Sequence, residues 1–322
     1  MREKKIPWST IIRLSITLLG VGYLAFFKEW DQIVGAVRGA NAGWLVAALV
    51  AYGVTTLLGI IRWHILLKAC HAGMEWNRTA QLTMIGLFAN TFMPGAMGGD
   101  LFKAVLAAKE IPHIKTTVVM SIVMERALGF IAMFIVSTIL ILNRFDALTT
   151  EPATKYAVAL YFVVFFLVLG LMILGTRRDI GKKIPYWDRL PFQEALKEAG
   201  ESYHFFIRHV ACFWGGLSLS IAAHFSLLLS CWFVACALGL NLQFWDLSAV
   251  LPLIALTMLV LPSIGGLGVR ELAFQHFLTY AAINKETSIA LSLIFFVVTL
   301  TWGGLGGIVY LQFRSRHPEK KV

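Results

Sequence analysis

Six charged residues lie inside or at the edges of long apolar stretches, where charged side chains are least expected. Three are acidic and three are basic. They are Asp100, Lys103, Glu125, Arg126, Arg270 and Glu271. One unpaired charge at the centre of a bilayer costs about 2.5–3.5 kcal/mol even on a lenient scale, so these groups must pair or line a water-filled cavity. Two interpretations follow: ion pairs that only hold helices together, or a site that also binds a charged ligand.

The spacing of these charges predicts their partners. Asp100 and Lys103 are three residues apart and share one face of a helix, so a local ion pair is expected. The other charges form two pairs of sequence neighbours, at 125–126 and 270–271. Neighbours on a helix point about 100° apart, so each is expected to pair with a group elsewhere in the chain.

Two breaks rich in glycine interrupt the apolar stretches next to these charges. The first spans 94–99 and the second spans 262–268. The first turn of a helix exposes free N–H groups and a partial positive charge, and glycine lets an anion approach them. Two such helix starts that meet within the membrane, beside Lys103, Arg126 and Arg270, would hold a phosphate group. The alternative is that the glycines only allow close helix packing.

Asn90 and Ser263 flank the two breaks and are expected to satisfy backbone groups that the breaks leave free. The candidate lipid-binding or ligand-binding residues are Asn90, Pro94, Gly98, Gly99, Asp100, Lys103, Glu125, Arg126, Pro262, Ser263, Gly265, Gly266, Gly268, Arg270 and Glu271. No catalytic residue, metal site or cofactor is predicted, because the sequence has no GxxxxGK[ST] loop, GxSxG motif or HExxH spacing. The four cysteines lack CxxC spacing and are expected to be small buried apolar residues.

The composition is that of a membrane protein. Hydrophobic residues make up 58% of the 322 residues and charged residues only 14%, with a mean hydropathy of +0.74. A soluble domain has about 45–50% apolar and about 25% charged residues, so lipid must serve as solvent for this chain. The net charge of +10 comes from short basic segments beside apolar runs, which favours a membrane surface over nucleic acid as the partner.

Six apolar runs are long enough to span a bilayer as helices, so the expected fold is an all-α polytopic membrane bundle. The predicted spans are 9–27, 45–67, 116–142, 156–175, 210–240 and 288–313. The regions 80–108 and 247–281 are interrupted by the two breaks, so each is expected to form a re-entrant hairpin or a broken span. The loop 176–209 contains a mixed segment at 192–209, expected to be an amphipathic helix on the membrane surface.

The distribution of Lys and Arg predicts the orientation of the chain. Suppose that each interrupted region returns to the side of the membrane from which it entered. Twenty of the Lys and Arg residues then fall on the side of the N-terminus and five on the other side. Arg62 is counted among the twenty, and only Lys103, Arg126 and Arg270 remain within the membrane. Basic residues gather on the cytoplasmic side, so both termini are predicted to be cytoplasmic.

The two interrupted regions resemble each other. Trp76 lies 18 residues before Pro94, and Trp245 lies 17 residues before Pro262. Under the predicted topology the first hairpin enters from the cytoplasm and the second from outside, which is typical of an inverted repeat. The chain is therefore expected to be one domain, 1–322, with halves at 9–142 and 156–313. Chance similarity between two Gly/Pro breaks is the alternative.

Three motifs in this order resemble one membrane-protein family. They are the segment 90–103 (NTFMPGAMGGDLFK), the pair 125–126 (ER) and the segment 262–271 (PSIGGLGVRE). Together they resemble the transmembrane, flippase-like region of lysylphosphatidylglycerol synthases over roughly 10–315. The Gly-Gly-Asp motif of that family usually ends in Arg, whereas this chain has Lys103, which puts bidentate phosphate binding there in doubt. The resemblance implies a stand-alone translocation region without the soluble synthase domain.

The resemblance implies that the chain is a lipid translocator, of the flippase or scramblase type, in the bacterial plasma membrane. Its partners would be membrane lipids with phosphate-containing headgroups and no nucleic acid, and a homo-oligomer is left open. One alternative is an intramembrane lipid-modifying transferase, so whether the chain is an enzyme stays open. Another alternative is a secondary transporter of a small anion.

Overall fold

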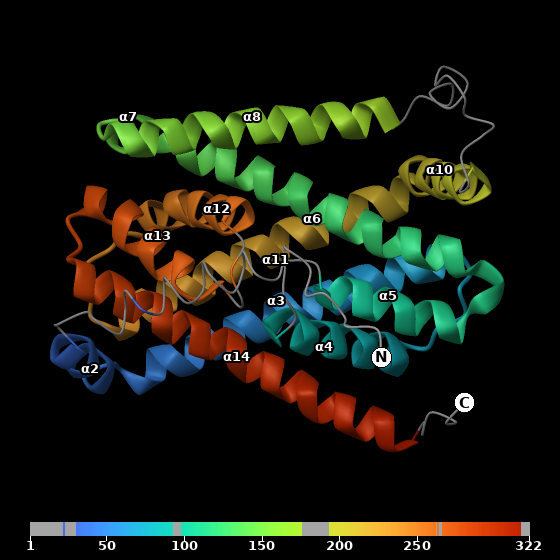
Figure 1. The fold of residues 1–322 in the computed structure, drawn as a ribbon, viewed down its shortest axis with the longest axis horizontal. Coiled ribbons are helices and arrows are strands. Elements are labelled where there is room, and N and C mark those ends of the chain that lie inside the picture. The colour runs from blue at the N-terminus through green and yellow to red at the C-terminus, as the bar shows by residue number, and fades with distance from the viewer. Residues whose placement is uncertain are drawn as a thin grey trace, which may run out of the picture.

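The described part of this computed structural model consists of helices, turns and short connections. It covers residues 30–92, 98–175, 193–261 and 266–316, together with Gly22 and Ser263. These helices form an all-α membrane bundle, as predicted (Figure 1). In a bilayer every backbone N–H and C=O must be satisfied within the chain, and helices achieve this without partners.

Five helices in the described residues are long and apolar enough to cross a membrane. They are α3 (Ala42–Ala69), α6 (Lys115–Asn143), α8 (Pro152–Gly175), α11 (Val210–Ala237) and α14 (Lys285–Arg316). They confirm five of the six predicted spans. Apart from Gly22, the predicted first span, 9–27, lies outside the described residues.

Shorter helices connect and fill the bundle. They are α2 (Trp30–Arg38), α4 (Trp76–Phe92), α5 (Gly98–Glu110), η1 (Pro112–Ile114), α7 (Phe145–Leu148), α10 (Gln193–Arg208), α12 (Phe244–Val260), α13 (Val269–Phe277) and η4 (Thr279–Ala281). The segment expected to be an amphipathic helix is indeed helical, as α10. Its buried Phe206 packs with residues of α6 in one apolar cluster.

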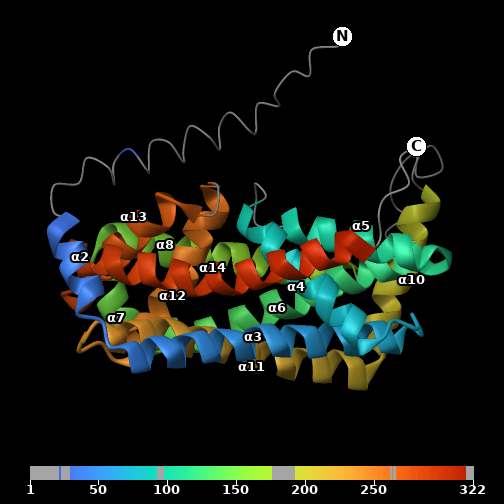
Figure 2. The ribbon, with the colours of Figure 1, turned by 90° about the horizontal axis from the view of Figure 1, so that it is seen from below.

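The antiparallel pair α3 and α11 runs along one long edge of the bundle (Figure 2). At one end the backbone N–H of Asn41 donates to the carbonyl of Ala237 at 2.8 Å. Further along, the Ser230 hydroxyl donates to Ala48 O at 2.8 Å and the Ser226 hydroxyl to Ala51 O at 2.7 Å. Small side chains let the two backbones approach, and their hydroxyls bond across the interface.

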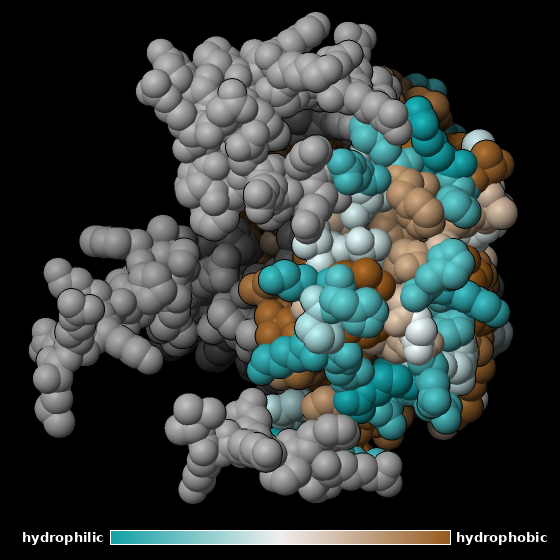
Figure 3. Space-filling model, turned by 90° about the vertical axis from the view of Figure 1, so that its right-hand side faces the viewer, coloured by the Kyte–Doolittle hydropathy of each residue, from teal (hydrophilic) through white to brown (hydrophobic). Residues whose placement is uncertain are grey.

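The outside of the bundle carries large exposed apolar side chains. Val46 is 59% exposed, Val163 63% and Leu311 66%. A surface of this kind needs lipid to cover it, so the protein is an integral membrane protein. Figure 3 shows the end of the bundle where α10 lies, and there hydrophilic residues gather between apolar ones, as expected near a membrane surface.

The first interrupted region forms a hairpin of α4 and α5. The end of α3, at Cys70 and His71, lines the same cavity as the start of α6, at Lys115 to Thr117. The chain therefore leaves through α4 and returns through α5 to the same end of the bundle. That end also carries α10 and the end of α14 (Figure 1).

The second interrupted region forms a hairpin of α12 and α13 that opens at the other end. The Tyr280 hydroxyl, after α13, donates to the carbonyl of Asp246, near the start of α12, at 2.6 Å. The side chain of Asp246 also pairs with Arg144, at the far end of α6, with 2.8 Å between Oδ1 and Nε. The two hairpins therefore open at opposite ends of the bundle.

Glycines of α14 allow the α4–α5 hairpin to pack against the long helices. A Cβ added at Gly306 would lie 2.1 Å from the carbonyl oxygen of Met84, and one at Gly307 would lie 2.8 Å from the Phe88 ring. Gly304 faces open space instead. The interface is therefore of the small-residue type that is common between membrane helices.

This packing predicts that Gly306→Ala destabilises the protein. The new methyl group would collide with backbone, which cannot move aside as a flexible side chain can, and overpacking typically costs about 1–3 kcal/mol. Gly304→Ala, on the same helix, is the matched control and should leave stability unchanged. Unfolding of the purified protein in mixed micelles measures both, and equal stability of the two variants would contradict the α4–α14 interface.

Candidate functional site

Five charged side chains from three helices meet where the first hairpin packs on α6. Lys103 of α5 pairs with Glu125 of α6, with 2.6 Å between Nζ and Oε2. Asp100 of α5 forms an ion pair with Arg126 of α6. Arg62 of α3 reaches Glu125 from the other side, with 3.1 Å between the guanidinium and Oε1. These five residues are called the α5–α6 charge cluster below.

The predicted local pair between Asp100 and Lys103 is wrong. Both side chains instead bond to α6, where Arg126 and Glu125 offer each of them its own partner. Glu125 and Arg126 were expected to pair away from each other, and this is confirmed. Because sequence neighbours point in different directions from a helix, each meets a different residue of α5.

Arg62 was missed as a site residue and counted with the cytoplasmic bases. It lies well inside α3, with 15% of its side chain exposed, and one nitrogen of its guanidinium donates to Ser220 Oγ at 2.8 Å. The signal was present, because Arg62 is the only Lys, Arg, Asp or Glu within the predicted span 45–67. Moving it to the membrane leaves nineteen basic residues against five, and the predicted orientation is unchanged.

Two glycines, Gly129 of α6 and Gly216 of α11, lie beside the Arg62 side chain at ordinary van der Waals distance. A Cβ added at Gly129 of α6 would lie 3.7 Å from the guanidinium, and one at Gly216 of α11 would lie 4.0 Å from Cγ. The side chain therefore passes between α6 and α11 to reach Glu125. This location places a permanent cation inside the bundle, since arginine does not lose its proton in proteins.

Lys103 and Arg126 differ in accessibility. Lys103 is 3% exposed, and its ammonium lies 3.8 Å from the centre of the Trp63 ring, which is a favourable cation–π contact. The side chain of Arg126 is 38% exposed, and within the described residues it bonds only to Asp100, through Nε. Lys103 is thus fully engaged inside the protein, whereas Arg126 keeps hydrogen-bond donors for another group.

The first break is held by Asn90 and Gly99. The backbone N–H of Gly99 donates to the side-chain oxygen of Asn90 at 2.8 Å, so Asn90 satisfies a freed backbone group as expected. A Cβ at Gly99 would lie 2.0 Å from the carbonyl oxygen of Gly86. Gly99 therefore serves close packing of α4 against α5. Gly98 begins α5, and Pro94 lies outside the described residues.

The charges at the second break pair with each other, which contradicts the expectation that they find partners elsewhere. Arg270 Nε donates to Glu271 Oε1 at 3.1 Å and to Ser292 Oγ at 3.0 Å. Glu271 is the third residue of α13 and bends back to accept from the N–H of Gly268 at 2.7 Å. In a capping box the acidic residue of the first turn accepts from the backbone N–H of the N-cap residue, and Glu271 makes this bond. The bond turns the Glu271 carboxylate toward Arg270.

Glycine is required at two positions of this second break by backbone conformation. Gly266 and Gly268 have φ of 76° and 82°, in the left-handed region that favours glycine. Ser263 was expected to satisfy a freed backbone group, and this is wrong within the described residues, because its buried hydroxyl has no hydrogen-bond partner there. Pro262 and Gly265 lie outside the described part of the chain.

Within the described residues the predicted site charges form two separately bonded clusters. No hydrogen bond or ion pair among the described residues joins the α5–α6 charge cluster to Arg270 and Glu271. The pair on α13 is electrically balanced, whereas the α5–α6 charge cluster holds three cations and two carboxylates. Only the latter has a net charge with which to attract an anion.

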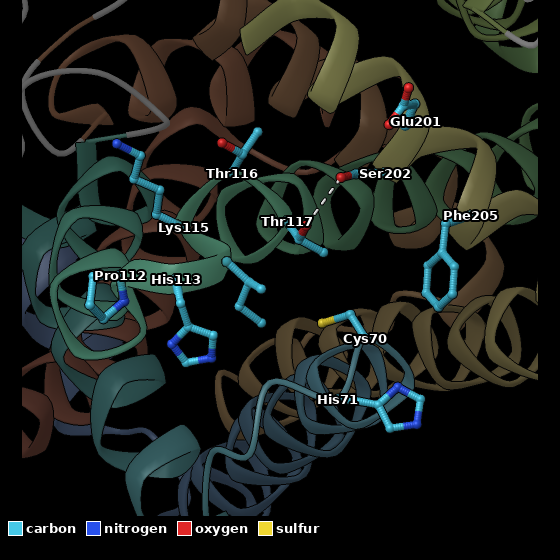
Figure 4. Close-up of a pocket in the computed structure, with 11 residues that line it drawn as sticks. Cys70, His71, Pro112, His113, Lys115, Thr116, Thr117, Glu201, Ser202 and Phe205 are labelled. Carbon is cyan, nitrogen blue, oxygen red and sulfur yellow. Dashed lines mark hydrogen bonds between the residues drawn. The ribbon is translucent and has the colours of Figure 1, made fainter. Parts of the chain in front are cut away.

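A polar cavity of about 450 Å³ lies at the end of the bundle beside the first hairpin (Figure 4). It was not predicted. Its lining includes His71, His113, Thr117 and Ser202, and the hydroxyls of the last two are 3.3 Å apart. Cys70 also lines it, and burial raises the pKa of its thiol, so it stays protonated at neutral pH.

Other chemistry finds no support within the described residues. No group of three or more His, Cys, Asp or Glu side chains there could hold a metal ion. The four cysteines are free, and Cys212 and Cys231 are buried as expected, whereas Cys70 and Cys236 are only half-buried.

Comparisons with known proteins identify relatives of this chain. A family model described as the lysylphosphatidylglycerol synthase transmembrane region matches residues 10–307. A UPF0104 membrane protein of Methanocaldococcus jannaschii is 24% identical over 183 residues, which are 56% of this chain and 53% of the relative. A UPF0104 membrane protein of Pyrococcus horikoshii is 22% identical over 98 residues, 29% of each chain. The matched region thus spans about half of the first relative and less of the second.

The α5–α6 charge cluster predicts a large loss of stability in Glu125→Gln. This change leaves Lys103 and Arg62 without their carboxylate, and breaking a buried ion pair typically costs about 3–5 kcal/mol. Glu110→Gln is the matched control, because Glu110 pairs with Arg78 at a more exposed position, where such a pair is worth about 1 kcal/mol or less.

Unfolding in mixed micelles measures both variants. Lys103→Met added to Glu125→Gln should recover part of the loss, because it removes one unpaired cation. Equal stability of the two single variants would show that the cluster is hydrated and does not hold the helices together.

Proposed function

The chain belongs to the family of lysylphosphatidylglycerol synthase transmembrane regions, and on this premise we propose that it is a lipid translocator. It would move a phospholipid or a related lipid with a polar headgroup between the two leaflets. The single observation that supports this most is the α5–α6 charge cluster, which sits deep in apolar helices and has a net positive charge.

The depth of the cluster suits a headgroup in transit. Arg126 is eleven residues from the start of the 29-residue helix α6, which corresponds to about 16 Å along the axis. The centre of a hydrocarbon core about 30 Å thick lies about 15 Å from either face. A lipid headgroup that crosses the bilayer must lose most of its hydration there, and a fixed cation replaces part of it.

Each member of the cluster has its own role in this proposal. Arg126 binds the phosphate, because it keeps free donors and is exposed. Asp100 orients Arg126 through their ion pair. Lys103, Glu125 and Arg62 hold α5, α6 and α3 together beneath it. Arg270 was expected to share the phosphate, but its bonds to Glu271 and Ser292 fit a structural role at the start of α13 better.

The polar cavity lies nearer the end of the bundle than the cluster does. Cys70, on its rim, is eight residues after Arg62, so the cluster lies about 12 Å deeper along the same helical path. In this proposal a headgroup approaches Arg126 along the outer side of α5 and α6, where the Arg126 side chain is 38% exposed. Movement needs no chemical step, because a concentration difference or the membrane potential can drive it.

The topology proposed with this function treats both hairpins as re-entrant and the chain as one inverted-repeat domain. The end with α10 and the end of α14 would face the cytoplasm of a bacterial cell, because most basic residues gather there. The hairpin of α4 and α5 would then enter from the cytoplasm, and the hairpin of α12 and α13 from outside.

The proposed activity predicts that the purified protein speeds lipid exchange between leaflets. Liposomes with fluorescent phospholipids, reconstituted with and without the protein, measure the fraction of label that becomes accessible to a reductant outside. Protein-containing liposomes should lose about twice the signal of empty ones, which lose only the outer leaflet. If liposomes with and without the protein lose the same fraction of signal for every headgroup tested, the proposal is contradicted.

Two further readouts from the same liposomes separate the alternatives. Covalently altered lipid, found by mass spectrometry, would instead support a transferase. Uptake of a soluble anion without any lipid exchange would support a secondary transporter.

The proposed orientation predicts opposite labelling of two engineered cysteines. In a background without native cysteines, Thr150→Cys lies between α7 and α8, and Lys109→Cys lies at the end of α5. Both positions are exposed. In intact bacterial cells a membrane-impermeant maleimide should label only Thr150→Cys, and permeabilisation should expose Lys109→Cys. The reverse pattern would invert the assignment.

A further inference from the structure

The charges around Arg126 and the exposure of its neighbours indicate which class of lipid would bind there. Resting on the proposed function, we propose that the substrate is a phosphodiester lipid with one net negative charge. Its phosphate would bind Arg126 on the outer side of the seam between α5 and α6, while its acyl chains stay in the bilayer. The seam is defined by Asp100 and Arg126 and by the exposed apolar residues beside them.

The first argument is the balance of charge. Within the described residues, the α5–α6 charge cluster has one cation more than it has carboxylates. A lipid with one net negative charge would neutralise the cluster. A zwitterionic lipid would leave the excess in place, and a cationic lipid would increase it at a depth where uncompensated charge is most costly.

The second argument is the direction in which the free donors face. Arg126 is the most exposed of the paired side chains in the cluster, at 38%, against 14% for Asp100 and 3% for Lys103. The contact with Asp100 is made at Nε of Arg126, and the two terminal amino groups donate no hydrogen bond within the described residues. Two parallel donors of one guanidinium match two oxygens of a phosphate group.

The third argument is the surface that surrounds Arg126. On α6, Val123 is 49% exposed and Phe130 36% exposed, three residues before and four after Arg126 on the same helix face. On α5, Leu101 is 67% and Val105 47% exposed. Acyl chains would cover such apolar flanks, whereas a soluble anion would gain nothing from them. The seam therefore fits a lipid better than free phosphate.

Binding to the purified protein in detergent tests the charge class directly. The ligands are short-chain phosphatidylglycerol, phosphatidylcholine and lysyl-phosphatidylglycerol, with net charges of about −1, 0 and +1 at neutral pH, and inorganic phosphate. Phosphatidylglycerol should bind at least about tenfold more tightly than the other two lipids, and phosphate at the same concentration should not displace it.

Variants locate the binding site. Arg126→Gln should remove the preference for the anionic lipid, and Arg126→Lys should keep part of it through charge alone. Lys109→Gln, which removes an exposed base from the same helix α5, is the matched control and should behave as wild type. Thermal unfolding of each variant shows whether it is folded.

The outcomes separate this inference from the proposed function. Equal binding of the three headgroups, tightest binding of the cationic lipid, or an unchanged preference in folded Arg126→Gln would overturn it. Displacement by inorganic phosphate would show an anion site that does not need acyl chains, and would also overturn it. If the wild type binds phosphatidylglycerol selectively but exchanges no lipid in liposomes, the translocator proposal fails and the charge assignment stands.

Discussion

The interaction on which most of this structure depends is the contact of Glu125 with two cations. Its carboxylate holds Lys103 of α5 on one side and Arg62 of α3 on the other, so three helices meet at one group. In a medium that hydrates charge poorly, the Glu125 carboxylate stabilises both buried cations, and they in turn stabilise the carboxylate. The geometry of the first hairpin is therefore fixed by charge as well as by apolar packing.

Close contacts between helix backbones stabilise the first hairpin in addition to the ion pairs. Gly99 places α5 against Gly86 of α4, and Gly306 places α14 against Met84 of the same helix. Lipid offers little hydrophobic drive for helices to associate, so small residues and polar contacts must supply it. These close contacts hold the described parts of α4 and α5 together, and a binding group such as Arg126 needs a fixed support to keep its donors aligned.

The two glycine-rich breaks look alike in sequence but differ in what they do. At the second break, Glu271 bonds to the N–H of Gly268 and to Arg270, so the helix start and its base are satisfied internally. At the first break, Asn90 satisfies the backbone of Gly99 instead, which leaves the nearby acid, Asp100, free to orient Arg126. The functional proposal therefore rests on the first break alone.

The sequence by itself determined the membrane class, five of the spans, the two breaks and the family, because these depend on runs of apolar residues and on local motifs. It also identified the charges that matter, with the exception of Arg62. Only the tertiary structure decided which charges pair, since this depends on how helices far apart in the chain are rotated and how closely they approach. Asp100 and Lys103 could bond locally, yet partners on α6 bind both, and that choice leaves Arg126 exposed with donors free.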